Sequence, residues 1–174
     1  MLIKTLFVNF LYRVITLIIN GYFSIVYSTF RKRYQIADAF YFNGREILLY
    51  GEGEIMCGEN SYIGDRSTLH AAKGYKLIIG NGCQISSNVR IFTQTAIADA
   101  DFSQKPVPSK FGDVNIGNYC WIGANVLINP SVTIGENAVV GANSVVSKDI
   151  PAGEIWGGVP AKLIRKKLEI QLAE

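Results

Sequence analysis

Few side chains in this chain of 174 residues are able to carry proton, metal or nucleophile chemistry. There is one histidine, His70, and there are three cysteines, Cys57, Cys83 and Cys120, which lie far apart in the sequence. A histidine-based zinc site needs two or three histidines, so a single one excludes such a site within one chain. An odd, sparse set of cysteines argues against a disulfide scaffold and for a reducing compartment. Histidine-dependent chemistry therefore rests on His70 or is missing.

The composition is that of one compact domain, because 49% of the residues are apolar and only 18% are charged. Intrinsic disorder and low-complexity linkers are thereby excluded. The formal net charge is only +3, and the basic residues gather at positions 31–33 and 162–167. A nucleic-acid-binding domain usually carries a larger and broader positive excess, so we expect no nucleic-acid partner.

The first 34 residues differ from the rest of the chain. No charge occurs in residues 14–30. Polar residues recur at intervals of three or four, which on a helix gives one narrow polar stripe on an otherwise apolar surface. The stripe consists of Thr5, Asn9, Arg13, Thr16 and Asn20. Gly21 is expected to end or bend this helix.

Three interpretations of residues 1–30 stay open. The helix lies in a membrane surface, packs on its own trimer or domain, or spans a bilayer. The basic cluster Arg31-Lys32-Arg33 follows the apolar stretch. If the segment meets a bilayer, this cluster places the rest of the chain on the cytoplasmic side.

From residue 57 onward the sequence repeats with a period of six. Glycine directly follows four of the six aliphatic residues in the C-terminal part of the repeat. Those six are Ile116, Ile122, Ile128, Ile134, Val140 and Val146, and the earlier matches are Cys57, Ile63, Leu69, Ile79, Ile85 and Ile91. Such a period fits neither an α-helix nor an alternating strand, and chance spacing in an amphipathic sheet would not keep glycine in register. It predicts a solenoid in which three hexapeptides close one triangular coil around the aliphatic side chains.

These patterns divide the chain into four parts. We expect an N-terminal helical segment at 1–34, an irregular lead-in at 35–56, a β-helix of about four coils at 57–166, and a tail at 167–174. The break in register after Ile91 predicts a loop projecting over about 93–113. A short C-terminal helix carrying Lys162 and Arg165 is expected after the last coil.

Three motifs make the chain resemble the hexapeptide-repeat acyltransferases of the sugar O-acetyltransferase type. They are WIGA at 121–124, VVGANSVVSKDIP at 139–151 and GVPAKLIR at 158–165. The closest kin by these motifs are the maltose and galactoside acetyltransferases and the enzymes that acetylate capsule and O-antigen sugars. Ser131 and Ala152 depart from the pattern, in place of a usual glycine and proline. The resemblance covers about residues 57–166 and implies an all-β fold, a left-handed parallel β-helix, in a homotrimer that binds acetyl-CoA between neighbouring subunits without a metal.

The resemblance also implies a cofactor site. Ala124 and Ala142 match positions whose backbone contacts the pantetheine arm, and Ser147 and Lys148 match the nucleotide end of CoA. Lys162 and Arg165 match the basic pair that meets the phosphates, which agrees with the need of a phosphate-rich ligand for Lys and Arg donors. The alternative is that these two basic residues only solvate a C-terminal helix. Trp121 matches a place beside the cofactor arm, and a subunit interface fits it equally well.

Acetyl transfer to a sugar hydroxyl needs a general base, because the hydroxyl must lose its proton as it attacks the thioester. The family's base is a histidine just after the coil that begins the projecting loop, and this position is Ala96 here. Three explanations stay open. The base was replaced by engineering, which we favour, it was lost naturally, or another residue such as His70, Asp99 or Asp101 takes the role.

The resemblance and the residues together favour an acetyl-CoA-dependent O-acetyltransferase that is inactive as given because of Ala96. Its acceptor is expected to be a sugar of a surface-polysaccharide or lipid-linked oligosaccharide precursor, met at the cytoplasmic membrane face. Arg66, Asp99 and Asp101 are the candidate acceptor-binding residues, although exposed loop carboxylates are common. The alternative function is an inactive hexapeptide-repeat protein that binds CoA or sugar or serves as a partner subunit.

Overall fold

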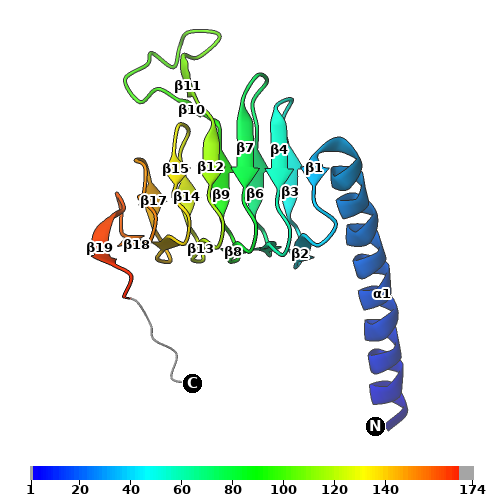
Figure 1. Ribbon diagram of the computed structural model, residues 1–174. Coiled ribbons are helices and arrows are strands. Elements are labelled where there is room, and N and C mark those ends of the chain that lie inside the picture. Colours follow the sequence, from blue (N-terminus) through cyan, green and yellow to red (C-terminus); the bar gives the residue numbers. More distant parts are fainter. Residues whose placement is uncertain (1, 169–174) are drawn as a thin grey trace. The chain divides into compact units, whose positions relative to one another are not determined.

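The computed structural model describes residues 2–168 and divides the chain into two units, Met1–Arg33 and Tyr34–Glu174. The first unit is one helix, α1 (Leu2–Arg33), which continues without interruption through Gly21 (Figure 1). The expected end or bend at Gly21 is therefore wrong, since a single glycine costs a helix only about 1 kcal/mol. Within α1, Val8–Arg33 is long and apolar enough to cross a membrane by length and composition, and none of its most apolar stretch is buried. Its last turn carries Arg31, Lys32 and Arg33, which complement the negative end of the helix dipole.

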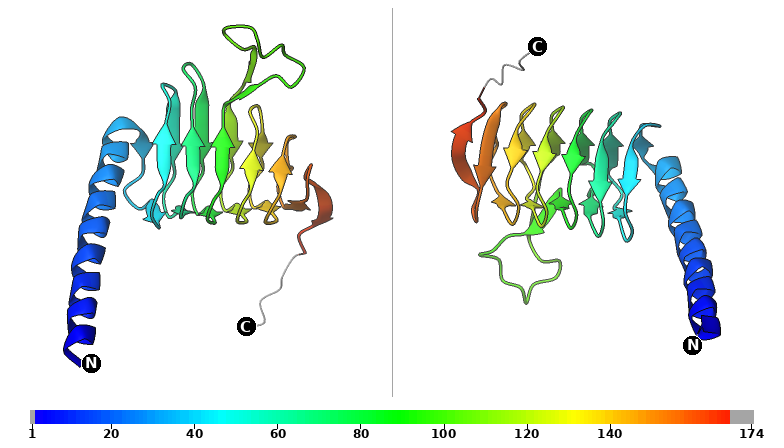
Figure 2. Two further views of the ribbon diagram at one scale, coloured as in Figure 1. Left: turned by 180° about the vertical axis from the view of Figure 1, so that it is seen from behind. Right: turned by 90° about the horizontal axis from the view of Figure 1, so that it is seen from below.

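The second unit is a parallel β-helix whose three faces are sheets (Figures 1 and 2). Face A consists of β1 (Gln35–Ile36), β4 (Glu54–Cys57), β7 (Lys76–Ile79), β12 (Val114–Ile116) and β15 (Thr133–Ile134). Face B consists of β2 (Tyr41–Asn43), β5 (Tyr62–Gly64), β8 (Gln84–Ile85), β13 (Trp121–Ile122), β16 (Val139–Val140), β18 (Glu154–Gly157) and β19 (Lys162–Lys166). Face C consists of β3 (Leu48–Tyr50), β6 (Thr68–His70), β9 (Arg90–Phe92), β14 (Leu127–Ile128) and β17 (Val145–Val146).

The solenoid starts earlier than the hexapeptide pattern indicates. The lead-in segment forms a first coil from β1, β2 and β3, each paired in parallel with the strand one coil further on. Phe42 and Leu49 are in register with the inward Ile63 and Leu69. An aromatic stands where the repeat has an aliphatic, and the interval from Phe42 to Leu49 exceeds the period of six, so the sequence pattern does not reveal this coil.

The core is a set of aliphatic columns that run along the solenoid. Ile122, for example, is in register with Ile85 and Val140 in the neighbouring coils, and all three are fully buried. Adjacent coils are about 4.8 Å apart, so each aliphatic side chain contacts its counterparts above and below. The repeat of six therefore produces one continuous apolar core. The three cysteines are buried free thiols within this unit.

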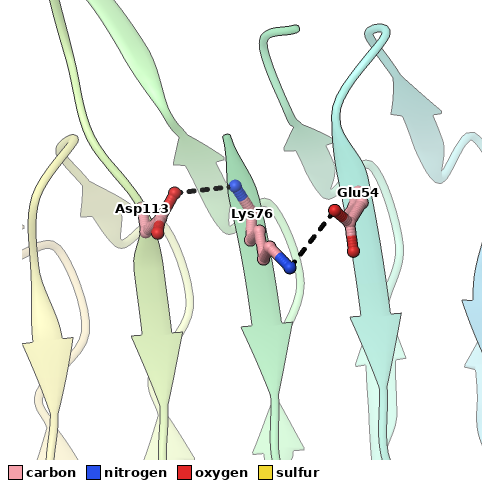
Figure 3. Close-up of polar contacts among 3 residues, drawn as sticks. All are labelled: Glu54, Lys76 and Asp113. Carbon is pink, nitrogen blue, oxygen red and sulfur yellow. Dashed lines mark hydrogen bonds and ion pairs between the residues drawn. The ribbon is translucent and has the colours of Figure 1, made fainter. Parts of the chain in front are cut away.

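The projecting segment leaves the edge between faces C and A (Figure 2). It contains an antiparallel pair, β10 (Gln94–Ala96) and β11 (Ser109–Phe111). At its return, Asp113 accepts a hydrogen bond from the backbone N of Lys76 at 2.8 Å, and Lys76 Nζ lies 3.2 Å from Glu54 Oε1. Figure 3 shows this chain of polar contacts, which joins three neighbouring strands of face A beside the base of the projection.

The expected C-terminal helix is not what residues 162–166 form. They are strand β19, which runs antiparallel to β18 at the end of face B. The last strand of a sheet presents unpaired N–H and C=O groups, and β19 satisfies those of β18. Residues 169–174 lie outside the described residues.

Candidate functional site

Ala96 stands at the end of β10, opposite Ser109 of β11, and is exposed. The base of this hairpin is anchored to the solenoid. Thr93 is buried, its Oγ1 accepts a hydrogen bond from the Ala72 backbone N at 2.8 Å, and its carbonyl accepts one from Gly112 N at 3.0 Å. Position 96 is thus presented to solvent from an anchored base, with room for a larger side chain.

Asp99 and Asp101 lie in the loop that joins β10 to β11, and both are exposed. The Asp101 carboxylate accepts a hydrogen bond from the backbone N of Ser103 at 2.9 Å. Hydrogen bonds from Ser103 hold the pKa of Asp101 below its ordinary value, so this carboxylate is charged at neutral pH. Neither carboxylate forms an ion pair within residues 2–168.

A pocket of about 240 Å³ at the last coil brings Lys148 and Lys162 together. Ser147 and Lys148 follow β17 at the edge between faces C and A, and β19 supplies Lys162. Trp156 of β18 lines the same pocket. Two ammonium groups around one pocket suit a phosphate group, which Lys recognises as a point charge.

Arg165 lines a different cavity, although it belongs to the same strand as Lys162. This cavity, of about 930 Å³, lies on face B, where Arg165 and Lys167 stand near Trp121 and Tyr119. Trp121 points outward from β13 with 53% of its surface exposed. The expected basic pair is therefore divided between two cavities within one protomer.

Ala124 and Ala142 occupy equivalent turns at the edge between faces B and C. The backbone N of Asn143 donates to the carbonyl of Ala124 at 2.8 Å, so the two turns are stacked on adjacent coils. The turns are tight, since a Cβ placed on Gly123 would lie 2.5 Å from the backbone N of Ala142. Asn125 and Asn143 adopt left-handed backbone angles, and Asn125 Nδ2 donates to Asn143 Oδ1 at 2.9 Å. At this edge Ala142 is exposed and Ala124 is half-buried.

Arg66 lies at the same edge, two coils nearer the N-terminus. With Arg45, Glu46 and Asp65 it lines a pocket of about 350 Å³. Asp65 Oδ1 accepts a hydrogen bond from the Arg45 backbone N at 2.7 Å. Glu46 and Arg66 have positive φ angles of 57° and 55°, where later coils have asparagine. Charged residues seldom adopt left-handed backbone angles, and residues with such strained angles cluster at functional sites.

His70 projects outward at the end of β6, at the edge from which the hairpin leaves one coil further on. Its ring lies between Tyr50 and Phe92, with ring centroids at 4.6 Å and 6.1 Å. Burial lowers the pKa of His70, so the imidazole is neutral at neutral pH. Tyr50 and Phe92 are not among the predicted site residues, because the period of six marks only the inward positions of the repeat. The signal was present, since aromatic residues occupy corresponding outward positions in three successive coils.

Comparison with known proteins agrees with this architecture. A family model described as bacterial transferase hexapeptide (six repeats) matches residues 113–148. The galactoside O-acetyltransferase of Escherichia coli (strain K12) is 37% identical over 117 residues, which cover 67% of this chain and 56% of that protein. The chain thus spans little more than half the length of this curated relative.

Two solved structures give the same assignment. The maltose O-acetyltransferase from Clostridium difficile 630 superposes with a TM-score of 0.60 and 32% identity, covering 75% of this chain and 72% of that one. A galactoside acetyltransferase in complex with coenzyme A superposes with a TM-score of 0.50 and 30% identity, covering 68% and 64%. The similarity in sequence and in fold together establishes the family: the chain belongs to the hexapeptide-repeat acyltransferases, which are left-handed parallel β-helices, and within them to the sugar O-acetyltransferase type.

Proposed function

We propose that this chain is an acetyl-CoA-dependent O-acetyltransferase that transfers the acetyl group to a sugar hydroxyl. The observation that carries the proposal is the pocket at the last coil, where Lys148 and Lys162 stand around one space beside Ser147. Two lysines around one pocket suit the phosphates of a nucleotide. The related galactoside acetyltransferase was solved in complex with coenzyme A, which supports the choice of nucleotide.

In this proposal the cofactor extends from the last coil toward the hairpin. Ala124 and Ala142 lie at the edge between faces B and C. Lys148 and the hairpin lie at the opposite edge of face C, where the chain leaves toward face A. The hairpin leaves the solenoid two coils before Ser147, a separation of about 10 Å at 4.8 Å per coil. An extended pantetheine arm bridges that separation and brings the thioester to the region of residue 96.

Ala96 then stands where the reaction needs its base. The chain as given is proposed to bind acetyl-CoA and to transfer acetyl groups slowly, with engineered replacement of the base as the favoured explanation and natural loss or another base as the others. The acceptor is proposed to be a surface-polysaccharide or lipid-linked saccharide precursor. Arg66, Asp99 and Asp101 offer it hydrogen-bonding groups from two elements. Ala96 also fits the alternative function, an inactive protein that binds CoA or sugar or serves as a partner subunit.

We further propose a homotrimer. Lys162 and Arg165 line separate cavities of one protomer, and in this proposal neighbouring protomers contribute one of the two residues each to a shared cofactor. A closed ring of identical subunits makes every such site equivalent. The division of the basic pair supports this assembly.

The cytoplasmic face of a membrane is the proposed location, with peripheral attachment. Apolar side chains of α1 are largely exposed, among them Ile18 at 67% and Ile25 at 69%. The last turn of the helix is basic and suits anionic lipid headgroups. In this proposal the helix lies in the plane of the membrane surface, with its polar stripe toward the headgroups.

Calorimetric titration with CoA tests the proposed function. The protein should bind CoA, and the variant with Lys162→Ala and Arg165→Ala should bind at least about tenfold more weakly, since one charged hydrogen bond is worth about 1.5–3 kcal/mol. The difference should shrink at high salt because the contacts are electrostatic. A matched control with Lys32→Ala and Lys73→Ala removes the same charge at residues that line neither cavity and lie outside the hairpin, and it should bind as the unchanged protein does. Absence of CoA binding, or equal loss in the control, would contradict the proposal.

A further inference from the structure

An aromatic row follows the edge of face C next to the projecting hairpin. Tyr50, His70 and Phe92 are partners in register on β3, β6 and β9, so their side chains stand on the same side of the sheet one coil apart. The imidazole lies 4.6 Å from the Tyr50 ring and 6.1 Å from the Phe92 ring, measured between centroids. Tyr50 keeps 40% of its surface exposed. The row therefore presents an accessible, partly apolar surface.

One ring nitrogen of His70 is not used within the fold. Its Nδ1 is buried and has no hydrogen-bond partner among residues 2–168. At a buried position, an N–H group without a hydrogen-bond partner costs more free energy than an unpaired nitrogen lone pair. A positive charge on the ring would add a desolvation cost. The neutral ring therefore carries its proton on Nε2, in keeping with the lowered pKa of His70. His70 thus offers an N–H donor between two aromatic side chains.

The aromatic row lies next to the hairpin that carries Ala96. The backbone N of Thr93 donates to the His70 carbonyl at 3.2 Å, which joins the row to the base of the hairpin that carries Ala96. The hairpin carries a second aromatic contact, since Tyr75 stacks on Phe111 of β11 with ring centroids 5.3 Å apart. The coil of His70 and the coil of Ser147 are three coils apart, which is about 14 Å at 4.8 Å per coil. The hairpin starts one coil after His70, on the side toward Ser147.

We propose that Tyr50, His70 and Phe92 form a binding platform for a pyranose ring of the acceptor. The C–H face of a pyranose packs on exposed aromatic surface, and Nε2–H of His70 donates a hydrogen bond to a ring hydroxyl. Two aromatic neighbours fix the imidazole without a protein hydrogen bond, so its donor is available to ligand. This inference rests on the proposed function, since it identifies the subsite that receives the sugar.

The platform is testable because His70 is the one histidine of the chain. Its Cε1–H signal in a proton–carbon NMR spectrum therefore needs no assignment. Methyl β-galactopyranoside, methyl α-glucopyranoside and methyl α-mannopyranoside are titrated separately into the full chain up to about 100 mM, a range that covers millimolar affinity. At least one of them should shift the His70 signal in a saturable way, and CoA added alone should shift it less.

Two variants sharpen the test. Tyr50→Ala removes one side of the platform and should weaken sugar binding about two- to tenfold, the range for one lost aromatic contact. Thr68→Ala is the matched control, because Thr68 lies outward on the same strand at its other end and should leave the titration unchanged. The platform is overturned if none of the three sugars shifts the His70 signal. It is also overturned if Tyr50→Ala and Thr68→Ala weaken sugar binding equally. If the protein binds a sugar at His70 but does not bind CoA, the proposed function is wrong and the platform is still supported.

Discussion

Replacement of Ala96 by histidine should convert this chain into a fast acetyltransferase. The side chain at position 96 is exposed at the end of β10, and the hairpin base is held by hydrogen bonds to Thr93 that do not involve residue 96. A histidine there meets no buried neighbour, so the variant should unfold at the same temperature. The residues proposed to hold CoA lie at the last two coils and should keep their affinity for it.

The size of the effect follows from the chemistry of a general base. A positioned base contributes about 10²–10⁴ in rate, which equals about 2.7–5.5 kcal/mol of transition-state stabilisation. An exposed imidazole titrates near 6.5, and only its neutral form accepts the proton. Its neutral fraction rises from about 9% at pH 5.5 to about 91% at pH 7.5, so kcat/KM should rise about tenfold over that interval.

The assay follows the release of free CoA from acetyl-CoA with a panel of methyl glycosides, and measures acetyl-CoA hydrolysis without sugar in parallel. Ala96→Gln is the matched control, since it adds a polar side chain without a base in this pH range. Turnover that is already fast with Ala96, and equal in the histidine variant, would refute the assignment of position 96. Variation at His70 would then be the next test of where the base lies.

Three further predictions concern assembly, location and stability. Light scattering at micromolar concentration should show a trimer, and a stable monomer would contradict the division of one site between protomers. Deletion of residues 1–33 should move the protein from the membrane fraction to the soluble one with its β-sheet circular dichroism unchanged, because the solenoid is a unit of its own; loss of the fold would favour a helix packed on its own protein. Ile122→Ala should lower the free energy of unfolding by about 2–5 kcal/mol, because Ile122 is fully buried between Ile85 and Val140. Trp121 is exposed, so Trp121→Ala should lower it less, and chemical denaturation measures both variants.

The hexapeptide spacing was sufficient to predict the solenoid, because a single inward residue per strand decides how each coil closes. Ile85, Ile122 and Val140 all occupy the positions that the period assigns to the core. The first coil was missed where Phe42 replaces an aliphatic and the spacing lengthens. A periodic pattern predicts only the coils that keep the period, although backbone pairing tolerates an extra residue at an edge.

The candidate site was harder to predict, because it depends on which edge of the solenoid each residue reaches. Lys148 and Lys162 line one pocket. Arg165 does not line it, since residues 162–166 form a strand in place of the expected helix and β19 places it at the cavity on face B. The aromatic row around His70 is not predictable from the period of six, because its members are 20 and 22 positions apart in the sequence and become neighbours only when the coils close.

The position of β19 links cofactor binding to assembly. This one strand supplies Lys162 to a pocket of about 240 Å³ and Arg165 to a cavity of about 930 Å³. In the proposed trimer each subunit therefore serves two sites, giving its Lys162 to one cofactor and its Arg165 to the next. A ligand that bridges two subunits stabilises their association by the same free energy with which association strengthens its binding. CoA should accordingly shift a diluted sample toward the trimer, and the shift should vanish when both basic residues are replaced by alanine. A trimer whose dissociation is indifferent to CoA would show that each protomer holds the cofactor alone.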